Sequence, residues 1–432
     1  MKPANSRRNF FYTASTIGAG VMGLPVWSDS LLDQLQSVNL RAGHYSPEEF
    51  ARTEEFWYLI QKAYRQSPHF INLENGYFSP QPVEVLQAQT DNIAMINEIP
   101  SFYMRRRQFE EKAAVKKQLA TLAGCTPEEI VITRNTTESL DTIIAGIDFA
   151  PGDEAIMCDQ DYGSMLEAFE QQGRRRGLVN KFVELPLHPE SDDAIVSCYE
   201  KAITDKTKII LVTHLINISG QVLPVRKIAD MAHRYGVEVL CDGAHAFAQL
   251  DFKIPDLNCD YYGASLHKWL CTPLGAGILY VRKEKIAKVW PLFGDTTYPA
   301  DDIRKFEHIG THPVSTNLTI ANAIRFHQTI GAARKEARLK YLKSYWTEKV
   351  KDTPGIILNT PFDPTRHGAI ANVGVTGMTP NELADQLYHE FNIFTVAINN
   401  PSVKGVRITP HLYTRLEDLD TLVLALNTLS RR

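Results

Sequence analysis

The chain has 432 residues, of which 44% are hydrophobic and 22% charged, a composition typical of a soluble globular protein that excludes the disordered and fibrous classes. Its 46 basic and 50 acidic side chains give a formal net charge of −4, so no general basic field favours a nucleic acid as partner. The six cysteines are scattered, without a C-x-x-C pair or a Cys/His cluster at metal-ligand spacing, so no metal site is expected.

Residues 1–30 resemble a twin-arginine export signal. The motif S-R-R-N-F at residues 6–10 is followed by a weakly apolar stretch at residues 13–24, which is shorter than the roughly 18 residues needed to span a bilayer, so we expect no permanent membrane span. Residues 11–12 depart from the usual Leu-Lys ending and no A-x-A cleavage site follows, and a frayed N-terminal helix is the alternative. The signal predicts a periplasmic or exported protein; without it, the protein is expected in the cytoplasm.

Residues 31–110 are predicted to form an N-terminal segment that packs against a smaller C-terminal domain and borders the cleft. Interdomain crevices often bind ligands, and the turn at residues 75–77 is expected to approach this one, so Asn75 and Gly76 are candidate substrate-binding residues. A run of three arginines lies nearby, at Arg105, Arg106 and Arg107. It can contact an anion, although such a run is more typical of a solvated surface.

Residues 111–315 are predicted to form a large α/β domain. Short apolar runs rich in β-formers alternate there with amphipathic segments, which places helices on the faces of a mostly parallel, seven-stranded sheet. One amphipathic segment, residues 225–235, has helical spacing and predicts a crossover helix between the fourth and fifth strands. The predicted strands are residues 130–133, 155–158, 181–185, 209–213, 237–241, 261–265 and 277–281.

Residues 316–432 have a different character. Helical patterns cover residues 317–345, 381–391 and 416–429, with short strands near residues 394–396 and 406–409. This mixture predicts a smaller C-terminal α+β domain.

An aspartate follows the fifth predicted strand. Asp242 lies at the carboxyl end of that strand, where side chains of a parallel sheet face the ligand crevice, and His245 comes three residues later. A carboxylate at this place can pair with a cationic ring nitrogen and keep the ring able to accept electrons. An aspartate that only caps the next helix is the alternative.

A lysine follows the next strand. Lys268 lies just past residue 265 among apolar neighbours, and desolvation lowers the pKa of a lysine and frees its amine for Schiff-base chemistry. A lone lysine is usually a solvated surface charge, but Asp242 upstream and the glycine-rich residues 273–277 downstream favour a ligand site, because glycine lets the backbone approach a ligand closely.

The loop after the first strand, residues 133–139, brings hydroxyl side chains and backbone N–H groups to the start of a predicted helix. Such an N-terminus attracts anions and predicts a phosphate site. An ordinary N-cap with Glu138 in the first turn is the alternative.

In this order, the motifs resemble the class V aminotransferase family of fold-type I pyridoxal-phosphate enzymes, in the branch of the cysteine desulfurases and isopenicillin N epimerase-like proteins. The resemblance covers roughly residues 70–430 and implies pyridoxal 5'-phosphate as cofactor, with Lys268 forming the Schiff base, Asp242 paired with the pyridine nitrogen and His245 beside it. It also implies that Tyr162 stacks on the cofactor ring and that Asn217 lies near its phenolic oxygen. The residues implied to hold the cofactor phosphate are Thr136, Thr137, Ser265 and His267.

Two further motifs of that family lie toward the C-terminus. Residues 308–311 resemble the segment whose threonine, here Thr311, reaches the cofactor phosphate of the neighbouring subunit, which implies a homodimer with active sites at the subunit interface. Residues 406–413 resemble the segment whose arginine, here Arg407, binds a substrate carboxylate, a task that suits the guanidinium fork.

One family feature is missing. Desulfurases place a nucleophilic cysteine in the region between Ile393 and Arg407, where this chain has none, so cysteine desulfurization is disfavoured. The expected function is that of a pyridoxal-phosphate enzyme acting on a small amino acid or amine, as a transferase or isomerase of the aminotransferase or epimerase-like kind. A C–S or β-eliminating lyase is the alternative.

Other classes fit less well. A serine hydrolase centred on Ser265 lacks the final glycine of the nucleophile elbow and has its acid and base in the wrong chain order, and a nicotinamide dehydrogenase lacks the G-x-G-x-x-G turn. A catalytically silent binding protein on the same fold is the alternative from a different class, and the joint presence of Lys268, Asp242 and Arg407 argues against it.

Overall fold

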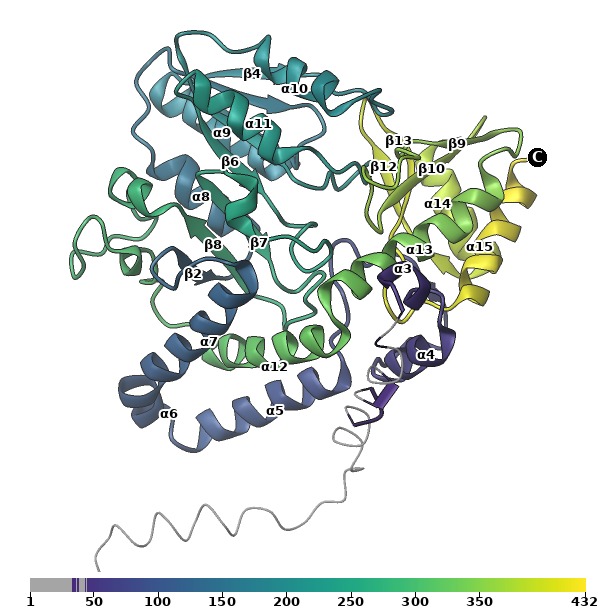
Figure 1. Cartoon of the computed structure of the whole chain (residues 1–432), viewed down its shortest axis with the longest axis horizontal. Helices are drawn as coiled ribbons and strands as arrows, with labels where there is room; N and C mark the ends of the chain where they lie inside the picture. The colour runs from purple at the N-terminus through teal and green to yellow at the C-terminus, as the bar shows by residue number, and fades with distance from the viewer. Residues whose placement is uncertain (1–32, 36, 39–42, 44) are drawn as a thin grey trace, which may run out of the picture.

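The computed structural model describes residues 33–35, 37–38, 43 and 45–432, so the expected export signal at residues 1–30 lies outside the described residues. Figure 1 shows a large lobe, built on strands β2 to β8, and a smaller lobe, built on β9, β10, β12 and β13, with helix α13 (Ala332–Val350) running between them. Among the described residues, no helix is both long enough and apolar enough to cross a membrane.

The larger sheet has seven strands in the order β2-β8-β7-β6-β5-β3-β4. The neighbours from β7 to β4 are parallel, and β8 lies antiparallel between β2 and β7. The predicted α/β class and mostly parallel seven-stranded sheet are thereby confirmed. The strands are β2 (Ile130–Thr133), β3 (Glu154–Cys158), β4 (Val179–Val183), β5 (Thr207–Thr213), β6 (Glu238–Asp242), β7 (Tyr261–Ser265) and β8 (Gly277–Val281).

Helices cover both faces of this sheet. Alternate residues of β3 point to opposite sides: Met157 packs in a core with α8 and α9, and Ile156 packs in a core with α7, α10 and α11. Burial on both faces explains why these strands read as continuous apolar runs. The helices are α7 (Gln108–Ala123), α8 (Thr136–Gly146), α9 (Gly163–Arg176), α10 (Asp192–Glu200) and α11 (Val225–Arg234), with short 3₁₀ turns at Ile254–Leu257, Lys283–Lys288 and Ile303–Phe306.

Several boundaries in the large lobe differ from prediction. Strands β3 and β5 begin before the predicted residues 155 and 209, and β6 lies one residue later than the predicted 237–241. Strand β4 lies two residues earlier than the predicted 181–185, because Val179 pairs with Glu154 at the sheet edge although its side chain is exposed, and so gives no burial signal. The crossover helix α11 ends at Arg234 rather than at Tyr235, whose side chain is exposed beyond the last turn.

The smaller sheet is antiparallel, in the order β12-β13-β10-β9, and packs against α13, α14 and α15. The prediction of one helical segment at residues 317–345 was wrong, because Gly331, with φ of 90°, separates α12 (Val314–Ile330) from α13. Strands β9 and β10 were not predicted. The remaining elements are β9 (Ile356–Leu358), β10 (Ala371–Val375), α14 (Pro380–Phe391), β11 (Ile393–Phe394), β12 (Val396–Asn399), β13 (Lys404–Ile408) and α15 (Leu416–Leu429).

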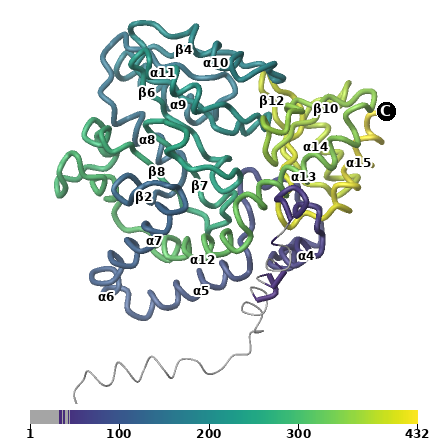
Figure 2. The backbone as a smooth tube through the Cα atoms, viewed as in Figure 1, coloured from purple at the N-terminus to yellow at the C-terminus, as the bar shows by residue number. Residues whose placement is uncertain are grey.

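The N-terminal part connects the two lobes. Strand β1 (Ile71–Asn72) pairs in parallel with β11 of the smaller lobe, whereas α5 (Val83–Glu98) packs along α12 under the larger one (Figure 2). The loop between β1 and α5 therefore passes between the lobes and carries the predicted turn at residues 75–77. The other helices here are α3 (Pro47–Phe50), α4 (Glu54–Lys62), α6 (Pro100–Phe102) and a π-helical turn at Tyr103–Arg107.

Candidate active site

A cavity of about 190 Å³ lies at the carboxyl ends of the parallel strands. Strands β5, β6 and β7 end there in Thr213, Asp242 and Ser265. Nine of the predicted site residues line it: Thr136, Thr137, Tyr162, Asn217, Asp242, His245, Ser265, His267 and Lys268. Residues from Thr136 to Lys268 thus meet at the sheet edge where ligands of α/β folds bind.

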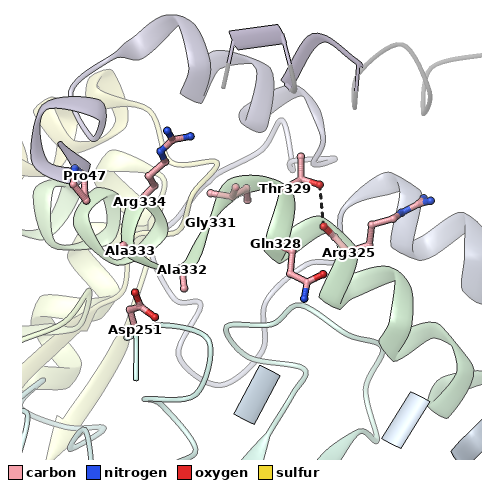
Figure 3. A pocket seen from close by; sticks show the side chains of 10 residues that line it. Pro47, Asp251, Arg325, Gln328, Thr329, Gly331, Ala332, Ala333 and Arg334 are labelled. Atoms are coloured by element: carbon pink, nitrogen blue, oxygen red, sulfur yellow. Dashed lines mark hydrogen bonds between the residues drawn. The ribbon is translucent and has the colours of Figure 1, made fainter. Parts of the chain in front are cut away.

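A larger and more open hollow, of about 910 Å³, lies where α12 meets α13 around Gly331 (Figure 3). Its wall includes Pro47, Asp251 and Arg325, and none of the predicted site residues. Volume alone therefore does not identify the site; the smaller cavity is preferred because chemically competent side chains converge in it.

Lys268 is the central basic group of the smaller cavity. Burial lowers the pKa of its amine to about 8, with Arg407 acting in the same direction and Asp242 and Glu74 acting against it. Its Nζ lies 3.1 Å from Nε2 of His245. An amine with this pKa is neutral in roughly a tenth of the molecules at pH 7, and the neutral amine is the form that attacks a carbonyl carbon.

Asp242 and His245 flank this lysine. Asp242 is buried, which raises the pKa of its carboxyl group, while the N–H of Ala244 and the nearby Lys268 act in the opposite direction. Burial, with Lys268 next in importance, lowers the pKa of His245 well below its ordinary value, so the imidazole is neutral and can accept a hydrogen bond from Nζ. A buried carboxylate, a neutral imidazole and an amine of low pKa are characteristic of a functional site.

The phosphate loop predicted from sequence begins helix α8. The side chain of Asn135 caps this helix by accepting a hydrogen bond from the N–H of Glu138, and the N–H of Thr136 donates to Oγ of Ser265 at 2.9 Å. Gly277 permits this contact between distant segments, because a Cβ atom there would lie 2.7 Å from the Asn135 backbone. Gly277 of the glycine-rich run at residues 273–277 therefore packs against the phosphate loop at residues 133–139.

Several polar atoms of the cavity residues lack partners. Oδ1 of Asn217, Nδ1 of His245 and Nδ1 of His267 are buried and make no hydrogen bond to any described residue. Buried polar atoms are rarely left unsatisfied in proteins, so these three atoms fit a polar ligand in the cavity. Burial lowers the pKa of His267 to about 4, so its imidazole is neutral. This ring stacks against the ring of Phe78, with 5.9 Å between the ring centroids.

Three of the remaining predicted residues lie behind the cavity rather than on its wall. Asn75 holds its loop to the smaller lobe, donating from Nδ2 to the Thr409 carbonyl and accepting from the Tyr413 hydroxyl. Gly76 lies against the guanidinium of Arg407. Arg407 is completely buried and forms an ion pair with Glu74 at 2.6 Å.

The other predicted residues lie farther from the chemistry. Thr311 is exposed and does not line the cavity, so its role toward a neighbouring subunit stays a prediction. The run from Arg105 to Arg107 is exposed in the π-helical turn, and Arg107 pairs with Glu111 at 2.8 Å, which is the solvated arrangement that the sequence favoured.

Sequence reasoning expected the turn that contains Tyr77 to approach the cleft, but it assigned no individual role to four residues at or near the site. Tyr77 and Phe78 line the cavity from the loop between the lobes, and Glu74 neutralises Arg407. Asp161 lies one layer below, where burial raises the pKa of its carboxyl group to about 7 while Thr213 and the N–H of Cys158 hydrogen bond to it. For Asp161, an acidic residue directly after an apolar strand was the available signal, whereas Glu74 had no signal within its own segment.

Comparisons with known proteins bear on this geometry. The family described as aminotransferase class-V matches residues 78–422. The chain is 26% identical to isopenicillin N epimerase of Amycolatopsis lactamdurans, over 87% of this chain and 99% of that protein. It is 27% identical to a probable cysteine desulfurase of Halalkalibacterium halodurans, over 69% of this chain and 77% of that protein.

Solved structures show that the fold of this chain is shared with other proteins. One shows the cystine C-S lyase C-DES with its reaction product cysteine persulfide, at a TM-score of 0.75 and 22% identity over 83% of this chain and 98% of that one. Another is the apo cysteine desulfurase of Thermococcus onnurineus, at 0.74 and 22% over 86% and 97%. The resemblance inferred from the motifs is confirmed: the chain belongs to the aminotransferase class-V family.

Proposed function

We propose that this protein is a pyridoxal-phosphate-dependent enzyme that acts on the amino group of a small molecule, with Lys268 as its Schiff-base lysine. The observation that carries the proposal is the convergence, in one cavity, of an amine whose pKa is about 8, a buried carboxylate on Asp242 and the N-terminus of α8. The family and the curated relatives support the same conclusion.

The residues present fit this cofactor. Thr136, Thr137, Ser265 and His267 surround the N-terminus of α8 and would hold its phosphate, as helix N-termini do for anions. Asp242 would pair with the ring nitrogen, which favours the ionised carboxylate that burial alone disfavours. Tyr162, whose side chain is partly exposed in the cavity, would cover the ring, and Asn217 would approach its phenolic oxygen.

When bound, the cofactor supplies an electron sink for the electron pair released as a bond to the amine-bearing carbon breaks. The chain's own residues bind, orient and move protons. The neutral Nζ of Lys268 would be the base that moves the proton of that carbon, and Nε2 of His245 at 3.1 Å orients it by accepting a hydrogen bond.

The reaction type is proposed as transamination or epimerization. In both, a single mobile proton returns to carbon, and the one lysine amine of the cavity can carry it. A C–S or β-eliminating lyase is the second candidate, supported by the cysteine desulfurase relatives. The segment from β11 to β13 contains no cysteine, which argues against a persulfide-forming nucleophile there.

We also propose a homodimer and an exported location. Two exposed aromatic side chains lie beside the cavity and beside the segment of Thr311: Phe78 lines the cavity and is 62% exposed, and Phe109 lines a hollow together with His312 and is 64% exposed. Such a surface is typical of a protein interface. Export rests on the twin-arginine motif at residues 6–10. Replacing Arg7 and Arg8 by lysine should leave the protein in the cytoplasm on cell fractionation, and unchanged export would refute the signal.

An absorbance spectrum tests the main proposal. The purified protein should show a band near roughly 410–430 nm that borohydride removes, and Lys268→Ala should lack it. Lys343→Ala is the matched control, because Lys343 is a second buried lysine with a pKa lowered to about 8, located on α13 away from the cavity. A wild-type protein that stays colourless with added pyridoxal phosphate would contradict the proposal and favour a silent binding protein.

A further inference from the structure

Arg407 is already neutralised by a carboxylate of its own chain. Its Nη2 and Nε donate to the two carboxylate oxygens of Glu74 at 2.6 and 3.0 Å, and Nη1 donates to the Asn217 carbonyl at 3.2 Å. The side chains of Arg407 and Glu74 are 0% and 4% exposed. The guanidinium therefore offers no exposed surface to the cavity, and Arg407 is not part of the cavity wall.

The loop at residues 74–77 is built around this ion pair. The N–H of Tyr77 donates to Oε1 of Glu74 at 2.9 Å, and the Tyr77 ring lies 4.3 Å from Cζ of Arg407. At Gly76 a Cβ atom would lie 2.9 Å from the same Cζ, so the loop backbone lies too close to the guanidinium for any side chain at this position. Hydrogen bonds from Asn75 to Thr409 fasten the loop to the smaller lobe. The Glu74 carboxylate is thus held in place by the backbone N–H of Tyr77 as well as by its ion pair with Arg407.

A substrate carboxylate would have to displace Glu74. Both carboxylates would accept hydrogen bonds from the same N–H groups of the guanidinium, so the interaction energy that the substrate gains is lost by Glu74. Glu74 is then left as a buried, unpaired charge. A substrate without this carboxylate leaves the pair intact and needs no rearrangement. The loop conformation therefore selects against ligands that carry a negative charge next to the reacting carbon.

We propose that Glu74 takes the place of the substrate carboxylate on Arg407, so that the cavity accepts a primary amine whose reacting carbon bears no carboxylate and discriminates against α-amino acids. This rests on the proposed function for the reaction of the amine itself. The substituent on that carbon meets apolar and aromatic surfaces, because Tyr77, Phe78 and Met165 line the same cavity. An arylalkylamine matches both features.

The test compares ligands that differ only in a carboxylate. Dissociation constants of 2-phenylethylamine and of L- and D-phenylalanine are measured on the holoenzyme from the change in the cofactor absorbance band. We expect the wild type to bind the amine at least about tenfold more tightly than either amino acid, and Glu74→Gln to reduce this ratio by at least about tenfold, because the amide keeps the shape but removes the competing charge. Glu74→Asp keeps the charge and should retain the preference for the amine.

Two variants separate a local effect from general destabilisation. In the double variant Glu74→Gln, Arg407→Gln the gain in amino-acid binding should disappear, because no cation remains to receive the carboxylate. In Glu54→Gln the ratio should equal that of the wild type, since Glu54 pairs with the buried Arg338 away from the cavity, with one contact at 3.0 Å.

A readout that does not need the cofactor keeps this proposal distinct from the proposed function. In titration calorimetry, 3-phenylpropionate should bind Glu74→Gln at least about tenfold more tightly than the wild type. Equal binding of amine and amino acid by the wild type, together with no change for phenylpropionate in Glu74→Gln, would overturn the assignment of Glu74. A protein without a cofactor band would refute the proposed function, and the phenylpropionate titration would still decide whether Glu74 closes Arg407 to carboxylates.

Discussion

Nζ of Lys268 lies 3.1 Å from Nε2 of His245, so the one lysine of the cavity has a neutral imidazole as its nearest hydrogen-bond acceptor. The pair joins the end of β7 to the turn after β6, two neighbouring parallel strands. The low dielectric of this place affects both partners in the same direction, because burial disfavours the charged form of an amine and of an imidazole alike.

The lowered pKa of Lys268 predicts a pH-dependent stability of the cofactor-free protein. Between pH about 8 and 10.5 the folded protein binds fewer protons at this amine than the unfolded chain, so the free energy of unfolding rises with pH across that window. Lys268→Met removes the penalty and should raise the free energy of unfolding at pH 7 by about 1–3 kcal/mol. Urea unfolding of both proteins at pH 7 and pH 10 measures how much more stable the variant is than the wild type. If this gain in the free energy of unfolding is not larger at pH 7 than at pH 10, the low pKa of Lys268 is contradicted.

Asp161 predicts the opposite dependence on pH. Burial raises the pKa of its carboxyl group from 3.8 to about 7, so the folded protein binds more protons than the unfolded chain between these values and loses stability as pH rises toward 7. Asp161→Asn can keep both hydrogen bonds, to the Thr213 hydroxyl and the Cys158 N–H. Its free energy of unfolding should exceed that of the wild type by about 1–3 kcal/mol at pH 8 and not at pH 4. A variant less stable than the wild type at both pH values would show that the carboxylate is needed in its ionised form.

Gly76→Ala should destabilise the loop that encloses Arg407. The new Cβ atom would lie 2.9 Å from Cζ and Nη2 of the arginine, and such overpacking costs about 1–3 kcal/mol. Gly163→Ala is the control, because no atom lies within 4 Å of a Cβ built at that position. Thermal unfolding of both variants distinguishes the clash from a general glycine effect. Equal melting temperatures for the two variants would mean that the guanidinium can move away freely.

The proposed homodimer makes a prediction for two residues near each other on the surface. Phe109 and His312 line one surface hollow, and His312 follows Thr311 directly in the chain. Phe109→Asp should shift the protein from twice 48.7 kDa to 48.7 kDa in sedimentation equilibrium, because the substitution removes the exposed aromatic contact surface and replaces it by a charge. Thr311→Ala should keep the larger mass but weaken binding of pyridoxal phosphate. A wild-type protein that sediments as a monomer at micromolar concentration would contradict the shared site.

Local chemistry in the sequence located most of the candidate site. Strand ends followed by Asp242 and Lys268, and a hydroxyl-rich loop before a helix, carry their own signal, because each depends on residues adjacent in the chain. Glu74 gave no such signal. Its importance comes from contact with Arg407, which lies 333 positions later, and no pattern within either segment encodes that distance.

By itself, the sequence determined the fold class, the strands buried on both faces and the family, because apolar periodicity and short motifs are local properties of the chain. The tertiary structure decided which charges face the cavity. It joined Arg407 to Glu74, set Asn75 and Gly76 behind the wall rather than on it, and brought Tyr77 and Phe78 forward. The physical reason is that the energy of a charge depends on its burial and on its partner, and both are set only when the two lobes and the loop between them pack together.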